Sequence, residues 1–227
     1  MTALALLAAS GALFVGTHFA MSHPLRAVLV RMLGERGFLL VFVAVSLATF
    51  YGISRFYGPA AAEAPALLWP AGPAAWIVAT LLMWAGSVLF VGSLRRNPAF
   101  PTGGAVRERI AAPRGIFAIT RHPMMWGFAL WALVHAIVNS TLASLAVSAT
   151  IAILALGGAA GQDAKKQKLL GGPWAEWRRA TAFVPFGKGF ALPDAFALVG
   201  GTLLWLGATY AHGALGYRPA GVWAFFS

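Results

Sequence analysis

The chain is dominated by apolar runs whose length matches the thickness of a bilayer. A transmembrane helix needs about 20 apolar residues. Only 10% of the residues are charged and the mean hydropathy is +0.75, whereas a soluble domain carries about 25% charged residues. The sequence therefore predicts an all-α fold, a polytopic membrane helical bundle with about six transmembrane helices that forms one domain over residues 1–227. The runs lie at 2–21, 38–57, 74–94, 122–139, 141–160 and 193–213.

The first run has small residues in LAASGA that would suit a signal-peptide cleavage site. A signal peptide begins with a basic region, however, and here the basic residues follow the run instead, at Arg26, Arg31 and Arg36. We therefore expect the first helix to be retained.

The basic residues are distributed unevenly between the connections. Fifteen of the 17 Lys and Arg residues lie in three of them, 22–37, 95–121 and 161–192. Cytoplasmic loops carry such an excess, so we expect a multi-pass protein of a bacterial inner membrane with both termini in the periplasm. Topology and contact with anionic membrane lipid account for the net charge of +11, and we expect no nucleic acid partner.

Several kinds of chemistry are disfavoured by the residues that are missing. The chain has no cysteine, which excludes disulfides, zinc–thiolate sites and thiol catalysis. It has six carboxylates and none lies in the middle of a predicted span, which argues against a proton relay and against paired-carboxylate hydrolysis. No P-loop or GxGxxG motif is present.

The strongest functional signal is the stretch Ile119–His135, ITRHPMMWGFALWALVH. It begins with Arg-His-Pro at the expected membrane surface and continues into an apolar helix that carries His135. An ionisable side chain in a membrane helix is costly and usually faces a partner or a ligand. His18 lies in a similar apolar setting in the first run. Because neutral imidazole is a good axial ligand of haem iron, His18 and His135 are candidate iron ligands of haem b, and a hydrogen-bonded histidine within the helix is the alternative.

A second site is expected at the cytoplasmic membrane surface. Pro123 is suited to the first turn of a helix, whose N-terminus presents free N–H groups beside Arg121 and His122. These groups would suit the carboxylate of a haem propionate or of S-adenosylmethionine. The segment 162–186, expected to form two short helices broken near 171–173, would either cover this pocket or lie on the inner leaflet. We expect contacts with the cofactor at Arg121, His122 and Trp126 near this surface. We also expect one at His212, near the end of the last run.

Four motifs along the chain carry a resemblance to a known family. They are GTHFAMSHPLR, GERGF, TRHPMMWGFALWALVHAIVN and GPWAEWRRATAFVPF. Together they resemble the NnrU family of bacterial integral membrane proteins over nearly the whole chain. The name of that family comes from denitrification, which implies a link to nitrite and nitric oxide metabolism.

The same motifs are similar to those of plant 15-cis-zeta-carotene isomerase, a membrane enzyme with b-type haem. By this resemblance, His18 and His135 correspond to the two histidines that bind its haem. A further histidine of the isomerase falls near Arg55 and Phe56 here, where the chain has none. The resemblance implies haem binding more directly than isomerase activity.

A broader resemblance concerns the RHP motif of isoprenylcysteine and phospholipid methyltransferases. In those enzymes a pair of glutamates about 40 residues after RHP helps to bind S-adenosylmethionine. The matching place here holds Gln162 and Asp163. S-adenosylmethionine-dependent methyl transfer is thus an alternative function.

The predicted topology leaves the pairing of the histidines open. His18 is expected near the cytoplasmic side and His135 near the outer side, so one iron can take both only if the first helix is displaced or broken near Gly16. Otherwise His18 would pair with His122, and His135 with His212. We expect a haem-dependent redox enzyme or isomerase that acts on a lipophilic or small nitrogen-oxide substrate. Methyl transfer and a non-catalytic role in denitrification assembly are the alternatives.

Overall fold

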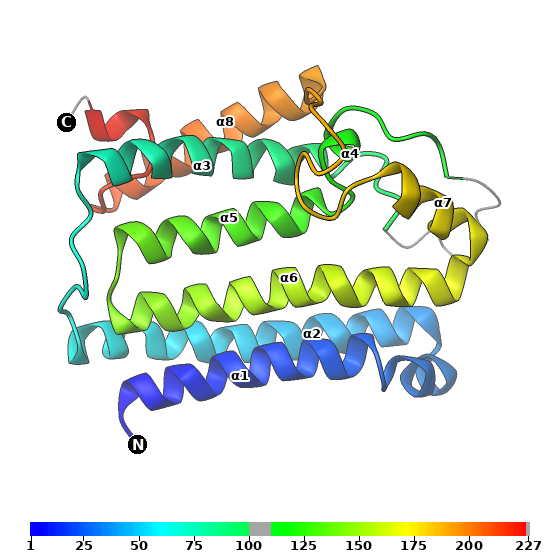
Figure 1. The fold of residues 1–227 in the computed structure, drawn as a ribbon. Coiled ribbons are helices and arrows are strands. Elements are labelled where there is room, and N and C mark those ends of the chain that lie inside the picture. The colour runs from blue at the N-terminus through cyan, green and yellow to red at the C-terminus, as the bar shows by residue number, and fades with distance from the viewer. Residues whose placement is uncertain (100–109, 226–227) are drawn as a thin grey trace. The chain divides into compact units, whose positions relative to one another are not determined.

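The computed structural model describes residues 1–99 and 110–225, and within these residues the chain is helical (Figure 1). Several helices begin where the sequence supplies a cap or a proline: Thr2 accepts a hydrogen bond from the Ala5 N–H at the start of α1, and Pro73 begins α3. The helices are α1 (Ala3–Ser22), α2 (Arg26–Glu63), α3 (Pro73–Gly92), α4 (Ile116–Ile119), α5 (Pro123–Val138), α6 (Leu142–Leu170), α7 (Gly172–Ala180), α8 (Ala195–Ala214) and the 3₁₀ helix η1 (Val222–Phe225).

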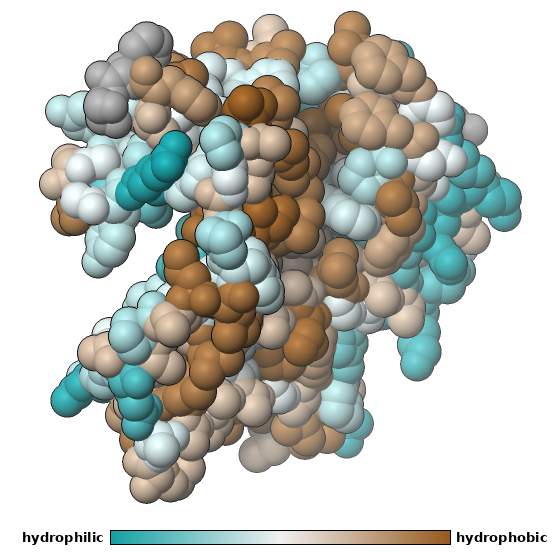
Figure 2. Space-filling view, turned by 60° about the vertical axis from the view of Figure 1, so that its left-hand side comes forward, coloured by the Kyte–Doolittle hydropathy of each residue, from teal (hydrophilic) through white to brown (hydrophobic). Residues whose placement is uncertain are grey.

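Each of the six predicted runs coincides with one of the longer helices. Among the described residues, α1, α2, α3 and α6 are long and apolar enough to cross a membrane, and α5 is apolar but has only 16 residues. Many apolar side chains face outward, for example Leu40 on α2, which is 73% exposed, and Figure 2 shows such side chains in brown over the helical surface. Outward apolar side chains are what a lipid environment requires. The prediction of an all-α membrane helical bundle is confirmed.

Two helices extend well beyond their predicted runs. The second run was expected from residue 38, but α2 already begins at Arg26 and bends at Gly34. The fifth run was expected to end at 160, but α6 continues to Leu170. Ala, Lys, Gln and Leu favour a helix, and no glycine or proline interrupts α6 between residue 162 and Gly171. The segment 162–170 is therefore the end of α6, not a separate helix, whereas the expected break at 171–173 and the following helix α7 are present.

The chain divides into two compact units, each built from two segments. Unit 1 comprises Met1–Ala71 and His135–Gly158, and unit 2 comprises Gly72–Val134 and Ala159–Ser227. Helices α5 and α6 each contribute to both units. The expectation of a single domain over 1–227 stays a prediction.

Small residues bring the helices of unit 1 together. A Cβ atom on Gly11 of α1 would collide with the Thr150 side chain of α6, and one on Gly157 would meet the Phe19 ring. Such contacts are typical of membrane helices, whose packing depends on close approach of the backbones. Since both residue numbers rise together, α1 and α6 run in the same direction. The buried core of this unit consists of Leu7, Phe14, Ile53, Ala60 and Ala143.

Unit 2 packs α3 against α8 in opposite directions. Gly201 of α8 lies against the backbone of Val88 on α3, where a Cβ atom would overlap Val88. The indole of Trp84 donates a hydrogen bond to Thr202 Oγ1 at 2.9 Å. A buried cluster that includes Val88, Ile116, Phe117, Trp174 and Trp177 joins these helices to α4 and α7. This cluster supports the polar site described next.

Candidate functional site

The start of α5 is fastened to the segment that follows α7, within unit 2. The Arg121 N–H donates to the Ala182 carbonyl at 2.9 Å, and the Phe186 N–H donates to the Ile119 carbonyl at 2.9 Å. The Thr120 hydroxyl donates to the Phe183 carbonyl at 2.7 Å. These hydrogen bonds satisfy three backbone carbonyls and hold residues 181–186 beside residues 119–122.

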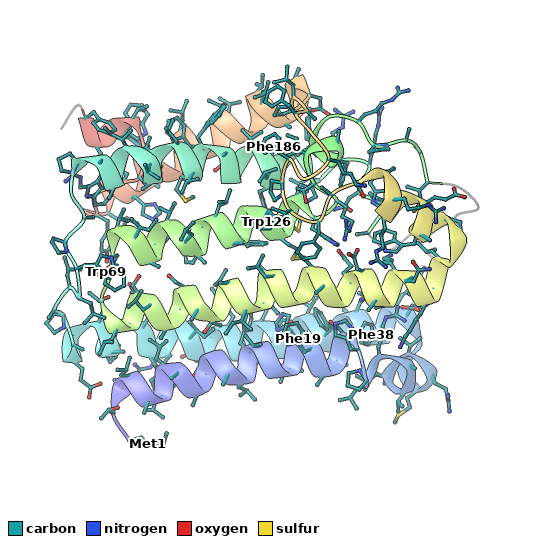
Figure 3. The ribbon with its side chains drawn as sticks, in the orientation of Figure 1. Met1, Phe19, Phe38, Trp69, Trp126 and Phe186 are labelled. Atoms are coloured by element: carbon teal, nitrogen blue, oxygen red, sulfur yellow. The ribbon has the colours of Figure 1, made fainter. Side chains whose placement is uncertain are left out.

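Trp126 is part of the same fastening. Its indole N–H donates to the Phe183 carbonyl at 2.8 Å, and Figure 3 shows Trp126 at the end of α5 that faces the segment carrying Phe186. Of the four residues expected to contact a cofactor, the structure therefore brings Arg121, His122 and Trp126 together.

A carboxylate from α6 lies between Arg121 and His122. The Arg121 guanidinium donates from Nη2 to Asp163 Oδ2 at 2.6 Å and from Nε to Oδ2 at 2.9 Å. His122 Nε2 lies 3.0 Å from Asp163 Oδ1. The three side chains are 9%, 0% and 10% exposed for Arg121, His122 and Asp163. We call these three residues the Asp163 cluster.

The cluster keeps Asp163 ionised. Asp163 lies beyond residue 160, where the apolar run 141–160 ends. Burial raises the pKa of the carboxyl, but hydrogen bonds from His122 and Arg121 and their charges outweigh burial and lower the pKa to about 2. Because the carboxylate only accepts hydrogen bonds, His122 donates to it from Nε2.

The remaining donors of Arg121 are also largely engaged. Nη1 donates to the Thr181 carbonyl at 3.2 Å, and the guanidinium carbon lies 5.3 Å from the centre of the Phe183 ring. His122 meets the same ring at 5.2 Å, and its buried Nδ1 has no hydrogen-bond partner. The cluster therefore has one unused polar atom among its three side chains.

A small recess adjoins the cluster. It opens to solvent, and both charged and apolar side chains reach it. Gln162, which stands where the resembling methyltransferases have a glutamate, is one of them. The lining residues are Asn97, Ala99, Arg121, His122, Pro123, Met124, Met125 and Gln162.

His18 occupies a different setting, between α1 and α2 of unit 1. Its Nδ1 donates to the Phe14 carbonyl one turn earlier at 2.7 Å. Its Nε2 lies 3.1 Å from the Ser46 hydroxyl oxygen. The rings of Phe14 and Phe42 lie 4.3 Å and 5.2 Å from the imidazole, centre to centre. The imidazole is thus surrounded by aromatic side chains and one hydroxyl.

The Ser46 hydroxyl has only one proton, and a second acceptor competes for it. The Phe42 carbonyl oxygen lies 2.7 Å from this hydroxyl, closer than His18 Nε2. When Ser46 donates to Phe42, the Nε2 lone pair of His18 receives no hydrogen bond from it. The ring is therefore fixed in one tautomer by Nδ1 and presents Nε2 as a weakly engaged donor atom for a metal.

The structure does not bring His18 and His135 together. The Leu4 N–H donates to Glu63 at 3.0 Å, which places the end of α2 beside the start of α1. From there the chain turns so that Trp69 Nε1 donates to the Ile137 carbonyl, two residues from His135. His18 lies 14 residues beyond Leu4 on an unbroken α1, about 21 Å along the axis.

Figure 3 shows the same separation, with Phe19 and Trp69 far apart along unit 1. The expected break near Gly16 is not present, because α1 is continuous from Ala3 to Ser22. His122 and His212 belong to unit 2, so the pairings of His18 with His122 and of His135 with His212 stay predictions. His212 is exposed, and its Nδ1 donates to the Ala208 carbonyl at 2.9 Å.

The family is decided by the extent of its match to the sequence. The family model described as NnrU protein matches residues 6–219. The chain belongs to the NnrU family. It has no match among the curated proteins and none among the solved structures. The matched region covers nearly the whole chain. It includes both His18 and the Asp163 cluster of this NnrU protein.

Sequence reasoning missed the residues that complete both sites of this NnrU protein. Asp163 was considered only as a substitute for a methyltransferase glutamate, yet it is the carboxylate that binds Arg121 and His122. Residues 162–170 contain no glycine or proline, and this pattern could have predicted that the helix continues through Asp163. Ser46 and Phe42 offered no signal, because they look like any other residues of an apolar span. In the described residues no three His or acidic side chains lie close enough to hold a metal ion together.

Proposed function

We propose that this NnrU protein is an integral membrane protein that binds b-type haem through His18. One observation supports the proposal above all others. His18 directs Nδ1 to the carbonyl of its own helix and Nε2 toward a hydroxyl that has a closer acceptor elsewhere.

The surroundings of His18 fit the requirements of a haem ligand. Histidines that bind metals almost always donate their other ring N–H to a carbonyl or a carboxylate, which fixes the ring and raises its basicity. The Phe14 carbonyl takes this role here. Phe14 and Phe42 provide aromatic surfaces for an apolar macrocycle, and His18 is only partly buried.

A single histidine is sufficient for this role. Haem iron is held by one proximal histidine in globins and peroxidases, and a second protein ligand is not obligatory. The distance between His18 and His135 along unit 1 therefore does not weaken the proposal for His18. His135 stays a second candidate ligand in the last turn of α5.

We infer a haem-dependent redox or isomerase activity on a lipophilic or small nitrogen-oxide substrate. When bound, haem would supply electron transfer or binding of a small ligand at iron. His18 lies within an apolar span, which supports a substrate that partitions into lipid. The proposed link to denitrification rests on the family name alone.

The absorption spectrum of the purified protein tests the proposal. A Soret band is expected for the wild type, and its absence after expression with haem precursor would overturn haem binding. Loss of the band in the His18→Ala protein is expected, because alanine maintains the helix but removes the imidazole. The panel to be purified in parallel is His18→Ala, His135→Ala, His212→Ala and, as the control, His23→Ala.

Methyl transfer is favoured by a different observation, the recess beside the RHP motif. Gln162 lines this recess, but the guanidinium of Arg121 already binds Asp163 and is not free for the carboxylate of S-adenosylmethionine. Saturable binding of S-adenosylmethionine by a protein without a Soret band would favour this function. A protein with neither property would favour a non-catalytic role in denitrification assembly.

We also propose that both termini face the periplasm of a bacterial inner membrane. The uneven distribution of Lys and Arg supports this orientation. A reporter fused at Gly72 should be active in the periplasm and one fused at Gly172 in the cytoplasm. The reverse result would overturn the orientation without affecting the haem proposal.

A further inference from the structure

The first eight residues of α2 form a separate helix that turns away from the rest. At Gly34 the backbone adopts φ 70° and ψ 170°, a conformation almost restricted to glycine. Figure 1 shows residues 26–33 nearly end-on, whereas the remainder of α2 lies along the picture. Residues 26–33 therefore run across the direction of the span to which they are joined. We call them the in-plane helix.

Side chains on both sides of Gly34 hold the bend. Arg26 Nη2 donates to both carboxylate oxygens of Glu35, at 2.9 Å and 3.1 Å. The same guanidinium lies 5.4 Å from the centre of the Phe38 ring. Because these contacts join the first residue of the in-plane helix to the start of the span, the angle between the two parts is fixed.

The in-plane helix has an apolar stripe that faces outward. Leu25, Val28 and Met32 are spaced three and four residues apart, which places them on one face of a helix. They are 46%, 50% and 73% exposed. An exposed apolar stripe on a helix next to a membrane span is stabilised when it enters the boundary between headgroups and acyl chains.

Basic side chains lie beside this stripe. Arg31 and Arg36 are exposed, and in residues 1–99 and 110–225 neither takes part in an ion pair. Arginine at the membrane surface is attracted to acidic lipid, with about 1 kcal/mol for each charge. The phosphate groups of acidic lipid would supply negative charge to Arg31 and Arg36, which have no acidic partner within the described residues.

We propose that the in-plane helix is an anchor that inserts Val28 and Met32, together with Leu25 just before it, into the bilayer surface. Arg31 on this helix and Arg36 just beyond the bend bind acidic phospholipid. The bend at Gly34 sets the depth of this anchor relative to the α2 span. The inference requires only that α2 spans a membrane and is independent of haem.

Nitroxide labels can test the depth of the anchor, because the wild-type chain contains no cysteine. Met32→Cys places a label on the apolar stripe, and Ala27→Cys places one on the opposite, exposed face. Each full-length protein is labelled and reconstituted in nanodiscs of phosphatidylcholine and phosphatidylglycerol. The label at residue 32 should collide more with oxygen, which concentrates in lipid, and the label at residue 27 more with a water-soluble nickel chelate.

Two outcomes of this measurement would overturn the proposal. If the label at residue 32 meets the nickel chelate as readily as the label at residue 27, the stripe lies in water. If it is immobilised and shielded from both reagents, a protein surface or a second copy of the chain covers the stripe instead.

The arginines are tested by lipid selectivity. The association of spin-labelled phosphatidylglycerol with the wild type should exceed that of phosphatidylcholine. In the Arg31→Gln/Arg36→Gln protein it should fall by about fivefold for each charge removed. Arg31→Lys/Arg36→Lys, which keeps both positive charges, is the matched control and should retain the selectivity. Equal loss in the control, or no loss in the Arg31→Gln/Arg36→Gln protein, would overturn lipid binding by these two residues.

Discussion

The buried Asp163 cluster of unit 2 and the partly buried His18 of unit 1 are both polar sites in an apolar protein, but they differ in how their hydrogen bonds are used. In the cluster, Arg121 gives three hydrogen bonds to Asp163 and one to the Thr181 carbonyl. His18 is fixed by one strong hydrogen bond and has a second nitrogen that meets only a shared hydroxyl. The first site holds the protein together, whereas the second retains a donor atom for a ligand.

This difference shows that charge density alone does not identify a binding site. The RHP motif attracted attention because it places two ionisable residues at a membrane surface. In the structure these residues mainly fix the segment 181–186 to the start of α5. The described contacts of His18 are with Phe14, Phe42 and Ser46, and none of these side chains is charged.

Asp163→Asn should have the largest effect, since it leaves the Arg121 guanidinium buried without a counter-charge. Breaking a buried ion pair in this way costs about 3–5 kcal/mol. The thermal unfolding midpoint in detergent should fall sharply. It can be measured by size-exclusion chromatography of heated samples. Glu176→Gln, an exposed acid on α7, should unfold like the wild type. An unchanged midpoint for Asp163→Asn would remove the structural role of the cluster.

Gly11→Ala should have an intermediate effect and act on unit 1. The added methyl group would collide with Thr150, a branched side chain with little freedom to move, and overpacking costs about 1–3 kcal/mol. Gly16→Ala on the same helix is the control, because no atom lies within 4 Å of its added Cβ. If both variants have the same unfolding midpoint, α1 and α6 do not pack as closely as described.

Trp126→Phe should have the smallest effect of the three. It removes the hydrogen bond to the Phe183 carbonyl, whose net contribution is about 0.5–1.5 kcal/mol, and retains most of the apolar surface. Amide hydrogen exchange should increase locally at 183–187, with little change in the unfolding midpoint. A large global loss of stability would mean that Trp126 does more than fasten this segment.

The sequence was sufficient to predict that the spans exist, but not where α2 begins or where α6 ends. Runs of about 20 apolar residues admit few structures other than helices in lipid. Pro123 begins α5, and Gly171 separates the end of α6 from the start of α7. The hydrophobicity pattern does not predict the bend at Gly34, because a glycine in a polar stretch is equally compatible with a loop and with a bend between two helices. Residues 22–37 were therefore expected to be a loop, although most of them are helical.

The partners within each site could not be predicted from sequence. Asp163 and Arg121 are 42 residues apart, and only the extension of α6 beyond residue 160 brings the carboxylate to the start of α5. His18 and Ser46 are 28 residues apart, on helices whose relative rotation follows from small-residue packing. Residues 100–109 of the predicted connection 95–121 lie outside the described residues.

The most direct measurement is the Soret absorbance of purified His18→Ala, recorded with and without added imidazole and compared with His122→Ala. We expect His18→Ala to remain folded, to lose the Soret band and to regain it when imidazole occupies the space left by the side chain. We expect His122→Ala protein that remains folded to retain haem, because the role of His122 is to bind Asp163. An unchanged Soret band in folded His18→Ala would contradict the assignment of His18 as the iron ligand.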